Sequence, residues 1–66
     1  LSNKERNRLE KVTAELAQKE KEVAQLETEY AQSNYTDANI QERLTKAQAK
    51  VEVLFEEWAE LEAKSQ

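Results

Sequence analysis

Apolar residues recur along this chain at alternating steps of three and four, in two separate runs, with one gap at Lys19 in the first run. The first run consists of Leu9, Val12, Leu16, Val23, Leu26 and Tyr30. The second run consists of Ile40, Leu44, Ala47, Val51, Leu54, Trp58 and Leu61. Such a repeat places all members of a run on one stripe of an α-helix, as in the a and d positions of a coiled coil. The pattern therefore predicts two long helices, each with a single apolar seam.

Helix breakers and cross-linking residues are absent from the chain. Its 66 residues include no Gly, Pro, Cys or His, and 36% of them are charged. Neither disulfides nor the common zinc ligands can hold so short a chain together, so its stability must come from regular helix packing. The Cys–His and Ser–His pairs of covalent catalysis are also missing. We therefore expect a domain that is not an enzyme.

A polar, turn-prone segment at residues 32–37 separates the two runs. Ser2 and Glu5 have the spacing of a capping box before the first helix, and Asp37 or Thr36 can cap the second. We predict an all-α fold, a two-helix antiparallel coiled-coil hairpin in one domain over 1–66. Its helices are expected over about 3–32 and about 38–64, with a turn over about 33–37.

One antiparallel register places every seam residue but one opposite an apolar partner. The expected pairs are Tyr30–Ile40, Leu26–Leu44, Val23–Ala47, Leu16–Leu54, Val12–Trp58 and Leu9–Leu61. The exception is Lys19 opposite Val51, where the lysine is expected to lay its stem along the seam, or to set the register as a polar defect. Trp58 is expected to anchor the core, whereas Phe55 and Val53 lie beside the seam and are the candidates for an exposed docking patch.

The same register brings charges of opposite sign together across the two helices. The expected ion pairs are Arg8–Glu57, Glu15–Lys50, Glu22–Arg43 and Arg6–Glu62. Exposed pairs of this kind contribute little to stability, so we expect them to select the orientation of the helices rather than to hold them together.

Charges sort onto two flanks of the predicted hairpin. The basic flank, made of c and g positions, carries Lys4, Arg8, Lys11, Arg43, Lys46, Lys50 and Lys64. These seven bases face five glutamates on the same flank, a net of +2, although the whole chain has a net charge of −4. The acidic flank carries Glu10, Glu20, Glu27, Glu42, Glu52, Glu56 and Glu62 with only Arg6 and Lys21.

The basic flank is the predicted nucleic-acid-binding surface, since such a row of bases can lie along a phosphate backbone. The other interpretation is an ordinary solvated face whose bases are used up in cross-helix ion pairs. The remaining carboxylates, such as Glu56, Glu57 and Glu60, share one exposed helix face and indicate solvated charge rather than a metal site. A two-helix arm also lacks the concave pocket of a small-molecule site, and no apolar run is long enough to span a membrane.

Motifs at both ends of the chain are similar to one known family. The beginning reads Leu1-Ser2-x-Lys4-Glu5 followed by Leu9-Glu10, and the end reads Phe55-Glu56-x-Trp58-x-x-Leu61-Glu62-Ala63. Both resemble the C-terminal domain of ABC-F ATPases of the Uup type, and Tyr35 in the turn matches an aromatic that the family tends to carry there. The turn itself departs from the family, because Ala31-Gln32-Ser33-Asn34 stands where an acidic segment with proline is common.

The resemblance implies a two-helix antiparallel coiled coil that follows two ATP-binding cassettes in a soluble cytoplasmic protein. It implies DNA or ribosomal RNA as the partner, since the Uup-type domain is described as DNA-binding and the wider family acts on ribosomes. The parent cassettes are a further candidate partner. ATP would be bound and hydrolysed in those cassettes, so no cofactor is expected in this domain. The start at Leu1 rather than Met also favours a C-terminal fragment of a larger ATPase.

Two other functions stay open at the level of sequence. One is a structural or protein-docking hairpin without affinity for nucleic acid, with contacts through Phe55, Val53 and the acidic flank. The other is the coiled-coil arm by which an aminoacyl-tRNA synthetase contacts tRNA. The sequence also leaves open whether two hairpins associate.

Overall fold

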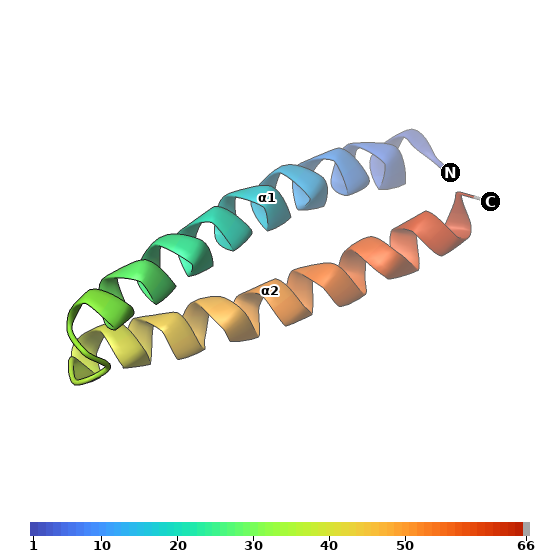
Figure 1. The fold of residues 1–66 in the computed structure, drawn as a ribbon. Helices are drawn as coiled ribbons and strands as arrows, with labels where there is room; N and C mark the ends of the chain where they lie inside the picture. The colour runs from blue at the N-terminus through green and yellow to red at the C-terminus, as the bar shows by residue number, and fades with distance from the viewer. Residues whose placement is uncertain (66) are drawn as a thin grey trace.

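Two long helices lie side by side in the computed structural model, which describes residues 1–65. Helix α1 spans Asn3–Gln32 and helix α2 spans Ala38–Lys64. They run antiparallel, so both ends of the chain lie together at the open end, and the turn closes the other end (Figure 1). The molecule measures 47 × 15 × 14 Å. The predicted all-α hairpin is therefore confirmed, as an arm with a single layer of contact between two helices.

Each helix begins at the cap that its sequence predicts. The hydroxyl of Ser2 accepts a hydrogen bond from the backbone N–H of Glu5 at 3.1 Å, and the Glu5 carboxylate accepts one from the backbone N–H of Ser2 at 3.3 Å. This is the reciprocal capping box. At α2 the cap is Asp37 rather than Thr36, because the Asp37 carboxylate accepts from the N–H groups of Asn39 and Ile40 at 3.0 and 3.2 Å.

The core of the hairpin is the predicted seam. The fully buried residues all belong to it: Val12, Leu26, Ala47, Leu54 and Leu61. Near the open end Val12, Leu54 and Leu61 form one apolar cluster, against which Leu9, Leu16 and the half-buried Trp58 pack. These six residues are the members of three consecutive predicted layers, so the register is confirmed there and Trp58 does anchor the core.

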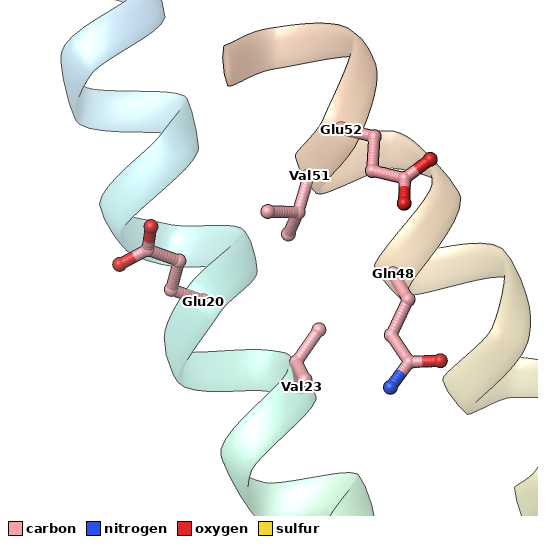
Figure 2. Close-up of a pocket in the computed structure, with 5 residues that line it drawn as sticks. All are labelled: Glu20, Val23, Gln48, Val51 and Glu52. Carbon is pink, nitrogen blue, oxygen red and sulfur yellow. The ribbon is translucent and has the colours of Figure 1, made fainter.

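The middle of the seam is less well filled. The side chain of Lys19 turns out of the seam, and its ammonium group lies 3.1 Å from the Glu22 carboxylate on one flank. Val51, its expected partner, is left half-buried. On the opposite flank Val23 and Val51 point into the space between the helices, with Glu20, Gln48 and Glu52 around them (Figure 2). The lysine therefore leaves an open hollow on each side of one layer.

The cross-helix ion pairs are only partly as predicted. Arg8 does pair with Glu57. The expected pairs Glu15–Lys50, Glu22–Arg43 and Arg6–Glu62 were wrong, since none of them is among the ion pairs within residues 1–65. Glu22 is occupied by Lys19 of its own helix, and the open end is closed by Lys64 with Glu5 at 3.4 Å. Pairs between exposed side chains are individually weak, so a competing partner close by displaces them.

Leu54→Ala should unfold the hairpin, whereas Phe55→Ala should not. Leu54 is 1% exposed within the apolar cluster, and removing such a side chain costs about 2–5 kcal/mol. Phe55 is 53% exposed, and its loss should cost less than about 1 kcal/mol. Urea unfolding followed by helical circular dichroism measures both values. Equal costs for these two neighbours would contradict the seam described here.

Lys19→Leu should stabilise the hairpin. A leucine fills the seam opposite Val51 in place of a side chain whose charge has to leave it, which should add roughly 1 kcal/mol to the free energy of unfolding. The matched control is Lys21→Leu, two residues further along α1 on an exposed position, where little change is expected. The interpretation of the middle layer is wrong if Lys19→Leu lowers the melting temperature.

Candidate nucleic-acid interface

All seven residues predicted to bind nucleic acid are exposed, and the hairpin gathers them into two clusters on the basic flank. The end cluster surrounds an open hollow near the chain termini and consists of Lys4, Arg8, Lys11 and Lys64. The middle cluster surrounds a second hollow and consists of Arg43, Lys46 and Lys50 together with Lys19. The two clusters are separate groups along the arm and do not form one continuous basic strip.

Helical spacing and the antiparallel fold both contribute to this arrangement. Lys4, Arg8 and Lys11 follow one another at steps of four and three along α1, which keeps them on one face. Arg43, Lys46 and Lys50 do the same along α2 at steps of three and four. Folding back of the chain then adds a base from the other helix to each set, Lys64 at the end and Lys19 in the middle.

Lys19 is the member of this surface that the sequence analysis missed. The repeat assigns it to the seam, but its ammonium group lies with the middle cluster, bonded to Glu22. A lysine in a seam position must carry its charge out to one flank, because burial of an unpaired charge is costly. The sequence does contain a residue that indicates this flank, since Glu22 lies three residues after Lys19 on the same helix face and can pair with it.

The bases differ in whether a carboxylate already holds them. Arg8 pairs with Glu57, Lys64 with Glu5 at 3.4 Å, and Lys46 with Glu42 at 3.2 Å in a pair that stays largely exposed. Within residues 1–65, the remaining four bases of the flank make no ion pair: Lys4, Lys11, Arg43 and Lys50. Each cluster thus contains two cations that form no ion pair within the part of the chain that the structure describes.

The two clusters lie apart along the length of the arm. Lys46 and Lys64 are 18 residues apart on α2, which at 1.5 Å per residue is roughly 27 Å along the helix.

The acidic flank has a different chemistry. Its hollow is bordered by the carboxylates of Glu20 and Glu52, so it would repel phosphate (Figure 2). Phe55 lies exposed on this flank and stacks on Trp58, with ring centroids 5.7 Å apart. Across residues 1–65 no three acidic side chains converge on a point where a metal ion would bind. Only the basic flank has the charge to hold an anionic backbone.

Comparison with known families matches residues 1–63 to the ABC transporter C-terminal domain. The chain belongs to this family. The family expected from the motifs at the two ends is thereby confirmed, and the hairpin described above is the fold of an ABC C-terminal domain. Comparison with curated proteins and with solved structures finds no match. In the described part of this C-terminal domain, neither helix is long and apolar enough to cross a membrane.

The ion pairs at the open end of the C-terminal domain shift the acid–base behaviour of their members. The hydrogen bond from Arg8 lowers the pKa of Glu57, and the same bond raises the pKa of Arg8. The pKa of Glu5 is lowered first by its hydrogen bond from the Ser2 backbone, then by the Ser2 hydroxyl and by Lys64. Both carboxylates therefore stay ionised at a lower pH than free glutamates do.

Glu57→Gln should lower the melting temperature of the C-terminal domain at neutral pH and have no effect in strong acid. The pKa of Glu57 is lower in the hairpin than its ordinary value of 4.5, so its charge stabilises the fold above about pH 4.5. That contribution is lost as the pH falls through the lowered pKa. Thermal unfolding of both proteins from neutral to acid pH measures the difference. A difference in melting temperature that does not change with pH would contradict this role of the Glu57 charge. Glu56→Gln, at an exposed neighbouring position, serves as the control.

Proposed function

We propose that this C-terminal domain is a non-catalytic arm of an ABC protein that binds the backbone of nucleic acid, DNA or ribosomal RNA, through its basic flank. The observation that carries the proposal is the presence in each cluster of two exposed bases without an ion pair within residues 1–65. The alternative of a solvated flank required those bases to be used up across the helices. Arg43 and Lys50, expected in such pairs, are instead available.

Binding would be electrostatic and largely independent of sequence. Each base that meets a phosphate releases condensed counterions, so affinity falls steeply with salt. Four available cations predict a slope of about −4 in a plot of log K against log salt concentration for B-form DNA. The bases lie along the length of the helices, so the contacts of the basic flank would follow the backbone and position the arm rather than read bases.

The net charge of −4 does not oppose this mode of binding at physiological salt. The hairpin is about 15 Å thick, so an anion on the basic flank lies about that far from the carboxylates of the acidic flank. The Debye length at physiological ionic strength is about 8 Å. Repulsion from the far flank is therefore strongly screened, while the bases in direct contact are not.

The parent protein would supply the energy-dependent part of the function. The resemblance of both chain ends to Uup-type ABC-F proteins supports ATP-binding cassettes outside these residues and a cytoplasmic location. In such a protein the arm would hold the nucleic acid or the ribosome while the cassettes bind and hydrolyse ATP. The family match argues against the aminoacyl-tRNA synthetase arm, since it assigns the chain to ABC proteins.

A protein-docking hairpin is the second candidate, and the exposure of Phe55 favours it. This ring is 53% exposed among the glutamates of the acidic flank, where a partner with an apolar and basic surface would fit. The parent cassettes are one such candidate partner. Under this second function Phe55→Asn weakens binding to the isolated cassettes, and no salt-dependent binding of nucleic acid is found.

Replacing Lys11 and Lys50 together with glutamine should weaken binding to a short duplex at least about tenfold at ~50 mM salt and reduce the salt slope from about −4 to about −2. The measurement is a fluorescence-anisotropy titration of duplex DNA and duplex RNA at several salt concentrations. The matched control replaces Arg6 and Lys21 with glutamine, which removes the same charge from the acidic flank. An equal loss in both variants, or no binding by the unchanged chain, overturns the basic flank as the interface.

Lys19→Leu separates binding from stability in the same titration. The change should make the hairpin more stable and yet weaken binding, because it removes a positive charge beside the middle cluster and leaves the Glu22 carboxylate without its partner there. Unfolding cannot explain a loss of affinity in a more stable protein. If Lys19→Leu leaves the affinity unchanged, Lys19 is not part of the interface, which then consists of the seven bases predicted from the sequence.

A further inference from the structure

The tip of the hairpin contains two adjacent residues in the left-handed conformation. Asn34 has φ 59° and Tyr35 has φ 61°, and neither is glycine. Asparagine tolerates this region, but a residue with a bulky side chain adopts it only where its surroundings enforce it. The strain therefore lies on one aromatic residue of the turn, which closes the end of the arm opposite the chain termini (Figure 1).

Hydrogen bonds and an aromatic contact hold this conformation. The N–H of Tyr35 donates to the carbonyl of Tyr30 at 2.9 Å, and the N–H of Asn34 donates to the carbonyl of Ala31 at 3.0 Å. The rings of Tyr30 and Tyr35 meet edge to face with centroids 5.3 Å apart. The Thr36 hydroxyl closes the turn on the carbonyl of Ser33 at 2.6 Å. Tyr35 is thus positioned by its surroundings rather than free to move.

This positioned ring stays in solvent. Tyr35 is 65% exposed, more than any other large apolar side chain of the part of the chain described. A ring that only sealed the end of the core would be covered by it. Here one aromatic contact fixes the ring and most of its surface is presented outward, which is the arrangement of a stacking platform.

The chemistry around the ring suits a nucleobase. Residues 31–36 carry no charge, and the carboxylate of Asp37 is engaged by two backbone N–H groups. Exposed side-chain amides lie nearby in the sequence at Gln32, Asn34 and Asn39. Proteins bind unpaired bases by stacking them on aromatic rings and by hydrogen bonds from amide side chains to their edges.

The tip is also close to the basic flank. Arg43 lies six residues beyond Asp37, roughly 9 Å along α2, and Lys46 follows it by three residues. A strand with one base on the tip can therefore continue onto the middle cluster within about two nucleotides. Phe55, the other exposed aromatic, has the opposite setting, because Glu52 is its neighbour three residues before it on the helix and no base lies within residues 51–59.

We propose that Tyr35 is a stacking site for an unpaired nucleobase, so that the arm recognises a duplex with an unpaired nucleotide rather than a uniform duplex. This inference rests on the proposed binding of a nucleic-acid backbone by the basic flank. It adds a contact that the charges alone cannot make, since phosphates are the same in paired and unpaired segments.

The test titrates the 66-residue chain with two duplexes that differ only in one bulged 2-aminopurine nucleotide, each made as DNA and as RNA. The chain should bind the bulged duplex about 5- to 100-fold more tightly, as expected for one base stacked on an aromatic ring, and stacking should quench the 2-aminopurine fluorescence. Tyr35→Phe should keep both effects. Tyr35→Asn should abolish both while leaving affinity for the paired duplex unchanged, since asparagine accepts the left-handed conformation.

The matched control is Phe55→Asn, which removes a similarly exposed ring and should keep the preference for the bulge. The inference is overturned if the unchanged chain binds both duplexes equally, or if Tyr35→Asn keeps the preference and the quenching. In either case binding to the paired duplex would still support the proposed function. Absence of binding to both duplexes would overturn the proposed function and the stacking site together.

Discussion

The apolar contact between α1 and α2 is the interaction on which every other feature of this hairpin depends. It consists of one seam, with no second layer of helices to cover it, and its densest part is the cluster of Val12, Leu54 and Leu61 near the chain ends. Only this contact brings Arg8 beside Glu57 and Lys64 beside Glu5. Without it the bases of the two helices would not share a flank, and the tip would not exist.

The seam is also where packing and surface charge oppose one another. Lys19 occupies a position where an apolar side chain would pack against Val51, and its ammonium group instead bonds to Glu22, at a hollow that Arg43 and Lys50 also line. The middle of the hairpin has a hollow on each flank, while the buried apolar cluster lies near the open end. Positions where a charged residue replaces an apolar one in the core are often found at functional surfaces.

A chain with an excess of acid can still present a positive surface, because the hairpin separates its charges by its own thickness. The flank-to-flank distance of about 15 Å exceeds the Debye length in the cell. Each flank therefore acts on a neighbouring molecule almost independently. In the proposed function an anionic backbone would meet the bases of one flank, and in the second candidate function a basic protein surface would meet the glutamates and Phe55 of the other.

The sequence by itself determined the two helices, their caps at Ser2 and Asp37 and the register of the seam, since helical periodicity and capping are local and repeat many times along the chain. The end motifs likewise indicated the family. Only the tertiary structure decided which ion pairs form, to which flank Lys19 turns, and that Asn34 and Tyr35 adopt positive φ. The ion pairs are choices between partners of similar energy, and the positive φ of Tyr35 is a strained conformation held by contacts around it, so the placement of neighbouring atoms decides both rather than the pattern of residues.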